Sequence, residues 1–190
     1  MPSTSSASLA PGPLVLASLI VLAALSRLLP HPPNVSPVEA VALFGGAYFG
    51  RRSLALVVPL LAMLLSDFAL GLINGGIYAD YFLGAGFITV YLCIALSTVL
   101  GFALRGRVSA WRVGGYSLVG SLLFYLVTNF GAWLGSPMYS QDAAGLAAAY
   151  VAGIPFFQNT VAGTLVYSAL LFGSFALLRQ QLPALRPQTA

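Results

Sequence analysis

The stretch that decides the fold is LLPHPPNVSPVEAVALFGGAYFGRR, from Leu28 to Arg52. It holds the chain's single histidine, four of its twelve prolines and one of its four acidic residues, between two apolar runs. Each proline fixes φ and biases the residue before it towards an extended conformation. We therefore predict a stiff polar lid at PHPPNVSP, followed by a short helix at SPVEAVALFGG. An alternative is that the prolines only separate two helices.

The composition of the whole chain is that of an integral membrane protein. Of its 190 residues, 59% are hydrophobic and 6% are charged, and the mean hydropathy is +0.92. Too few polar residues remain to cover a soluble globule of this size. All eight basic residues are arginines, and they fall at predicted helix ends rather than in a stripe that follows phosphates. The lipid bilayer is thus an expected partner, and nucleic acid is not.

Six transmembrane helices are expected in an all-α fold, because a span needs roughly 20 apolar residues. The predicted ranges are 13–29, 36–50, 53–73, 82–104, 113–134 and 158–178. A seventh apolar stretch, AAGLAAAYVAGIPFF, is short and contains Pro155 near its end. We interpret it as a half-helix that dips into the outer leaflet.

The charges predict the orientation of these helices. Seven arginines fall at alternate helix ends: Arg51, Arg52, Arg105, Arg107, Arg112, Arg179 and Arg186. The intervening loops carry Asp80 and Asp142. The positive-inside rule then places both termini in the cytoplasm and three loops outside, at 30–36, 74–81 and 135–157. Residues 1–12 are predicted to be a disordered tail, 13–180 the membrane domain and 181–190 a cytoplasmic tail.

Three ionisable residues fall in the outer third of the first three spans: Arg27, Glu39 and Asp67. Ionisable groups within spans are costly and are therefore usually paired or functional. Arg27 should pair with one of the two acids, because an unpaired charge at that depth costs far more. A structural ion network and a functional cluster both remain open.

Polar and small residues recur at four-residue spacing, which places them on one helix face. The stripes are Thr89, Cys93, Ser97 and Gly101; Ser121, Tyr125, Asn129 and Trp133; and Thr160, Thr164 and Ser168. Small and hydroxyl residues at this spacing usually mediate packing of membrane helices. Tyr125, Asn129 and Trp133 are larger, and we interpret them as a pocket wall. Asn159 lies where the sixth span needs an N-cap, and it could also face a cavity.

Catalytic motifs are absent from the sequence. It has no HExxH, GxSxG or Walker sequence and no Cys/His spacing typical of zinc. No permanent cofactor is expected. Cys93 falls near mid-membrane, where apolar surroundings favour a neutral, unreactive thiol.

Four segments together resemble a known family: RLLPHPPNVSPVEAVALFGGAYF, LLSD, TNFGAWL and YVAGIPFFQNTVAG. With the six-span topology, they are similar to the substrate-binding S-components of energy-coupling-factor (ECF) vitamin transporters, in particular the BtuM-like, cobalamin-specific type. The resemblance runs from about Arg27 to Phe175. It implies a protein of the bacterial inner membrane that binds a vitamin-like substrate, above all cobalamin, on the periplasmic side for transport into the cytoplasm.

The resemblance also implies site residues. The outer loops would cover the substrate with His31, Asn34, Tyr78, Asp80, Phe156, Phe157 and Asn159. BtuM-like proteins present a cysteine to the cobalt of cobalamin, and Cys93 is the candidate here. A thiolate is a soft ligand that suits cobalt, and metal binding itself favours loss of the thiol proton.

An ECF energising module is the implied protein partner, but one feature departs from the family. Many S-components dock through AxxxA in their first helix, and LVLASLIVLAALSRLL has no such pair. The chain would then act alone or dock through another face, such as Ala17, Ala24 and the small residues of the second helix.

Two other functions remain open: a membrane-embedded thiol enzyme acting on a corrinoid through Cys93, and a structural or assembly subunit.

Overall fold

The computed structural model describes residues 11–75, 82 and 84–185, and in these ranges all regular secondary structure is helical. The helices are α1 (Pro11–Leu25), α2 (Val38–Tyr48), α3 (Arg52–Asn74), α5 (Ala85–Phe102), α6 (Ala110–Gly135) and α7 (Ala143–Gln181), with 3-10 turns η1 (Ser26–Leu28) and η2 (Pro183–Leu185). The all-α prediction is confirmed. The first five predicted ranges each agree with a helix to within four residues at either end.

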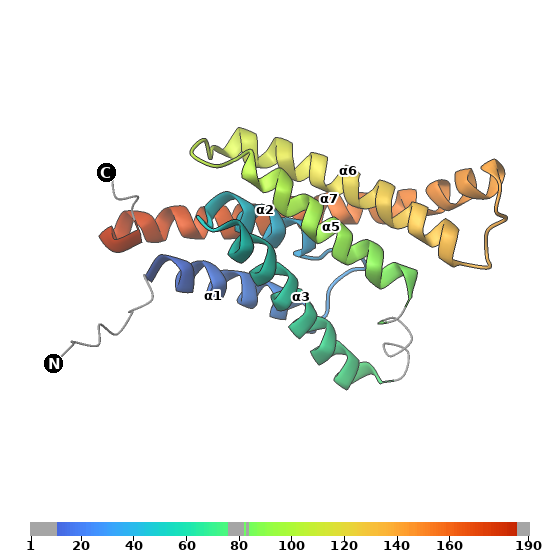
Figure 1. The fold of residues 1–190 in the computed structure, drawn as a ribbon, viewed down its shortest axis with the longest axis horizontal. Coiled ribbons are helices and arrows are strands. Elements are labelled where there is room, and N and C mark those ends of the chain that lie inside the picture. Colours follow the sequence, from blue (N-terminus) through green and yellow to red (C-terminus); the bar gives the residue numbers. More distant parts are fainter. Residues whose placement is uncertain (1–10, 76–81, 83, 186–190) are drawn as a thin grey trace.

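The short helix α2 lies at the centre of the bundle (Figure 1). Ten of its eleven residues are buried, and it packs against α1, α3, α5, α6 and α7. A helix that is apolar all round is stable only when neighbours cover every face. Eleven residues extend about 16 Å, so the longer helices around α2 must supply most of the thickness of the bundle.

Two glycines allow α2 to approach α5 closely. A Cβ on Gly46 would collide with the carbonyl of Thr98, and a Cβ on Gly101 would collide with the backbone of α2. At the C-terminal end of α2, Arg105 donates hydrogen bonds to the carbonyls of Gly46 and Phe49, at 2.9 and 2.8 Å. These bonds satisfy carbonyls that a helix end leaves unpaired.

The predicted half-helix ending at Pro155 is wrong. Helix α7 continues through Pro155 for 39 residues, which extend about 58 Å. A proline removes one intrahelical hydrogen-bond donor. A helix tolerates this loss where neighbouring elements pack against the turns before and after the proline. Asn159 is therefore inside the helix rather than its N-cap. Asp142 takes that position, and its Oδ1 accepts the backbone N–H of Gly145 at 2.8 Å.

Both described chain ends lie at one end of the bundle, together with the α2–α3 and α5–α6 connections (Figure 1). These connections carry Arg51, Arg105 and Arg107, whereas the α6–α7 connection with Asp142 lies at the opposite end. The predicted C-terminal tail differs in part, because η2 packs against α1 and α7 and Leu185 is buried. Residues 1–10 of the predicted N-terminal tail lie outside the described residues. The last two residues of that predicted tail, Pro11 and Gly12, belong to α1.

Three of the described helices are long and apolar enough to cross a membrane, namely α3, α6 and α7. Helices α1, α2 and α5 are apolar but shorter. Large apolar side chains such as Leu72, Trp111 and Leu170 are exposed on the outside of the bundle, where a bilayer would cover them. These features are those of a membrane protein.

Candidate functional site

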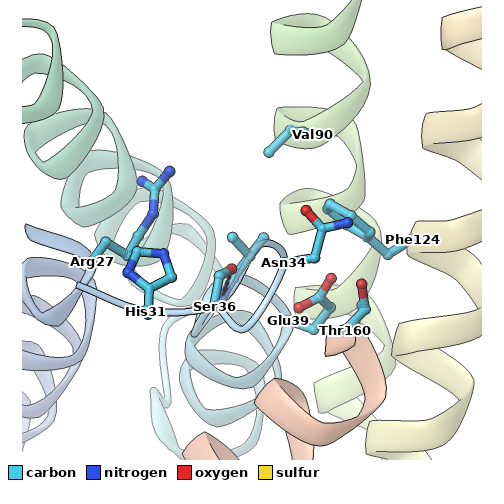
Figure 2. A pocket seen from close by; sticks show the side chains of 9 residues that line it. Arg27, His31, Asn34, Ser36, Glu39, Val90, Phe124 and Thr160 are labelled. Atoms are coloured by element: carbon cyan, nitrogen blue, oxygen red, sulfur yellow. Dashed lines mark hydrogen bonds between the residues drawn. The ribbon is translucent and has the colours of Figure 1, made fainter. Parts of the chain in front are cut away.

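A pocket of about 200 Å³ lies at the N-terminal end of α2 (Figure 2). It is lined by Arg27, His31, Asn34, Ser36, Val38, Glu39, Val90, Phe124 and Thr160. These residues come from η1, the connection 29–37, α2, α5, α6 and α7, so the fold gathers them from most of the chain. For comparison, a cavity of roughly 150 Å³ holds benzene. The pocket therefore suits a small organic molecule.

The connection of residues 29–37, here called the proline loop, is attached to α7. Asn159 donates a hydrogen bond from Nδ2 to the carbonyl of Pro33 at 2.9 Å. The backbone around Ser36 lies so close to α7 that a Cβ on Gly163 would meet it. Asn34 has φ +62°, in the left-handed region that asparagine tolerates better than most residues. The proline loop thus forms one wall of the pocket.

His31 and Asn34 are both exposed and both line the pocket. The ring of His31 is held by a 2.7 Å hydrogen bond between Nδ1 and the carbonyl of Leu29. In Figure 2, His31 lies beside Arg27, across the pocket from Glu39. The structure thus places these two predicted residues at a pocket, and their contact with a substrate stays a prediction.

The expected pairing of Arg27 with an acid is confirmed, and its partner is Asp67. Arg27 Nη1 lies 2.6 Å from Asp67 Oδ1 and also donates to Ser66 Oγ. The hydroxyl of Tyr91 donates to Asp67 Oδ2 at 2.9 Å. Asp67 is 1% exposed, and both of its oxygens have a donor. This carboxylate is fully satisfied within the protein.

Glu39, in contrast, is not part of an ion network. It is 2% exposed, and within the described chain no arginine pairs with it. Thr164 Oγ1 donates to Oε2 at 3.2 Å, whereas Oε1 has no hydrogen-bond partner among the described residues. Buried polar atoms are nearly always hydrogen-bonded. Figure 2 shows the carboxyl group beside Thr160, on the side of the pocket towards Asn34.

Of the large residues of the α6 stripe, Tyr125 and Asn129 lie against the first part of α7, and Trp133 lies against the α6–α7 connection. Tyr125 donates its hydroxyl to the carbonyl of Tyr150 at 2.6 Å, and Trp133 Nε1 donates to the carbonyl of Ser140 at 2.9 Å. Asn129 donates to the carbonyl of Tyr125 one turn earlier. None of the three lines this pocket, and their predicted role as the wall of a substrate pocket stays a prediction.

The remaining predicted residues are dispersed. Phe157 packs its ring against Tyr125, with 5.0 Å between centroids, and Phe156 is exposed; neither lines the pocket. Tyr78 and Asp80 lie outside the described residues. Cys93 is a free thiol with 0% exposure, and the pocket as formed does not reach it.

The suggested docking face is also wrong in part. Ala24 is 1% exposed, and the small residues of α2 are buried on every side. Both are used for packing within the bundle, so they offer no surface to another protein.

Among the described residues, no group of three or more His, Cys, Asp or Glu side chains is placed to hold a metal ion.

Sequence reasoning missed the apolar side of the pocket, formed by Val38, Val90 and Phe124. Phe124 directly precedes the stripe residue Tyr125, so the four-residue spacing pointed one position away. Thr160 did belong to a stripe, but its spacing alone indicated packing. No local signal marks Val90, which depends on how α5 packs against α2.

A family model matches residues 7–185, a range that includes every residue of the pocket. The chain belongs to this family, described as a family of unknown function (DUF6580). No curated protein and no solved structure matches the chain. The pocket and the buried α2 thus lie within the extent of the family.

Proposed function

We propose that this member of the family is a multi-pass membrane protein that binds a small, vitamin-like solute for uptake. The observation that carries the proposal is the polar pocket at the N-terminal end of α2, at a distance from the arginine-bearing end of the bundle. In the proposal, all six helices lie within the inner membrane of a bacterium. The arginine-bearing end faces the cytoplasm, and the solute enters under the proline loop.

Two physical arguments support this proposal. Ligand sites in helix bundles lie between helices and present converging polar groups beside apolar ones, and this pocket sets six polar residues against an apolar side formed by Val38, Val90 and Phe124. Ionisable residues at membrane depth are expensive and tend to mark ligand or ion pathways, and Glu39 has no counter-ion among the described residues. The chain carries no motif for ATP hydrolysis, so release to the cytoplasm needs an energising module or a reorientation of the protein.

Cobalamin is the specific substrate that the resemblance implies, and pocket size bears on it. Pockets for drug-sized ligands are about 300–1,000 Å³, and a corrinoid is larger than most such ligands. For cobalamin to bind, the proline loop would have to leave α7.

The binding of cobalamin is tested with protein purified from cells supplied with cobalamin. A thiolate-dependent shift of the absorption bands that disappears in Cys93→Ser supports cobalt coordination; an unshifted spectrum contradicts it, and colourless protein removes cobalamin as the substrate.

The proposed direction of entry is tested by labelling. In a Cys93→Ser background, Thr160→Cys places a small thiol on the pocket wall, and Val108→Cys places one in the α5–α6 connection as a matched control. A membrane-impermeant thiol reagent added to intact cells should label Thr160→Cys and not Val108→Cys. In inverted membrane vesicles the preference should reverse. Labelling of Thr160→Cys from the cytoplasmic side alone would contradict uptake through this pocket.

A further inference from the structure

The charges around the pocket do not balance. Of the three ionisable residues in its lining, Arg27 is neutralised by Asp67, and His31 is exposed and bonded to a backbone carbonyl. Glu39 has no counter-ion among the described residues, and its Oε1 has no hydrogen-bond partner there. The helices packed around Glu39 supply the hydroxyl of Thr164 and the thiol of Cys93, which carry no positive charge, and the nearby Arg27 is paired with Asp67.

An ionised carboxylate that is withdrawn from water is costly unless a cation and hydrogen-bond donors compensate it. The N-terminal turn of α2, where Glu39 lies, provides only partial compensation, because the helix dipole is a weak substitute for a full charge. A donor with a positive charge would satisfy Oε1 and balance the charge together. The described residues provide no such donor, and a cationic ligand in the pocket would supply it.

We infer that the pocket takes a small amine in its protonated form, with its ammonium group on Glu39 Oε1 and its apolar body against Val90 and Phe124. This inference rests on the proposed function, whose solute it assigns to a chemical class. The apolar side chains of Val90 and Phe124 favour an organic cation over a hydrated metal ion. An aromatic ring near the site further favours a cationic ligand over a neutral one.

Three compounds of nearly equal size test the assignment: benzylamine, benzyl alcohol and benzoate. At neutral pH the first is a cation, the second is neutral and the third is an anion. Binding to the full-length protein in detergent is measured by isothermal titration and by the midpoint of thermal unfolding. Benzylamine should bind and raise the midpoint, while the other two compounds should not.

The variant Glu39→Gln keeps the shape of the side chain and removes its charge. Asp142→Asn makes the same chemical change at an exposed site outside the pocket. Binding of benzylamine should weaken roughly 10- to 100-fold in Glu39→Gln, as expected on losing a hydrogen bond to a charged group, and should be unchanged in Asp142→Asn. Benzyl alcohol binding as well as benzylamine, or equal benzylamine binding in Glu39→Gln and wild type, would overturn the assignment.

A second readout leaves Glu39 intact, so it does not depend on folding of the variant. Benzylamine should slow labelling of Thr160→Cys, and benzyl alcohol should not. If periplasmic labelling occurs and benzylamine gives no protection, the amine assignment fails while uptake from the periplasm stands. If benzylamine protects Thr160→Cys but labelling occurs only from the cytoplasm, the amine site stands and the proposed direction of uptake fails.

Discussion

Two buried carboxylates lie in the same bundle and have different surroundings. Asp67 is 1% exposed and receives donors from Arg27 and Tyr91 on different helices. Glu39 is 2% exposed and accepts a hydrogen bond from the Thr164 hydroxyl, and within the described parts of the chain its Oε1 has no partner. The first site is complete without a ligand, and the second site lines a pocket. The difference separates a carboxylate that holds helices together from one that is available to bind.

Their positions explain the difference. Asp67 lies on α3, which packs against α1 and brings Arg27 within 2.6 Å. Glu39 lies in the first turn of α2, at the centre of the bundle, and the helices around it direct hydroxyl and apolar groups towards it. A stability role requires partners in the protein. A binding role requires an unsatisfied group beside a cavity, and Glu39 meets this condition.

The largest effect is expected at the ion pair. Arg27→Ala leaves Asp67 buried without its cation, and breaking a buried pair in this way costs about 3–5 kcal/mol. The free energy of unfolding, measured by titration with a denaturing detergent, should fall by that amount.

The double variant Arg27→Ala with Asp67→Ala is the control for that pair. Because it removes both charges, its cost should be smaller than the sum of the two single costs. Strictly additive costs would mean that Arg27 and Asp67 do not stabilise each other, and Asp67 would then not be a carboxylate that holds helices together.

The next effect concerns the wall beside Glu39. In Gly163→Ala, the new methyl group would meet the backbone of the proline loop at Ser36, and such overpacking costs about 1–3 kcal/mol. Gly173→Ala is the matched control on the same helix, since nothing lies within 4 Å of its Cβ position. The control should be as stable as wild type or slightly more so. Equal stability of both variants would show that the proline loop does not rest on α7.

The smallest effect is a pH dependence at the exposed N-cap of α7. Hydrogen bonds from the Gly145 backbone and then from Ser140 lower the pKa of Asp142 from its ordinary value of 3.8. Because the pKa of Asp142 is lower in the folded state, its contribution to stability is fully present at pH values above the ordinary value of 3.8. It is lost as the pH falls through the lower, folded pKa.

Thermal unfolding midpoints of wild type and Asp142→Asn, followed from neutral to strongly acidic pH, test this. The gap in favour of wild type should be largest at neutral pH and close on acidification. Because asparagine is also a good N-cap, the gap should be small throughout. A gap that widens in acid would contradict the assignment of Asp142 as an ionised cap.

The sequence predicted the helices well where length and hydropathy suffice, as at residues 52–74 and 110–135. It failed at Pro155, because helix breaking depends on whether neighbours support the chain, and here Tyr125 holds the turn before it. It also left open whether Arg27 pairs with Glu39 or Asp67, since helix packing decides the partner. Asn159 was placed at a helix start, but its bond to Pro33 spans 126 positions, and local patterns do not report such contacts.

The most direct test of the central claim compares Glu39→Gln with Asp67→Asn at one neutral pH. Each variant replaces a buried carboxyl group with an amide of the same shape, and the measured quantity is the free energy of unfolding. Asp67→Asn should lose about 3 kcal/mol or more, because Arg27 is left without its counter-ion. Glu39→Gln should be as stable as wild type or more stable, since no cation among the described residues depends on Glu39. If Glu39→Gln loses as much stability as Asp67→Asn, Glu39 has a partner within the protein, and the account of it as a ligand-binding carboxylate is contradicted.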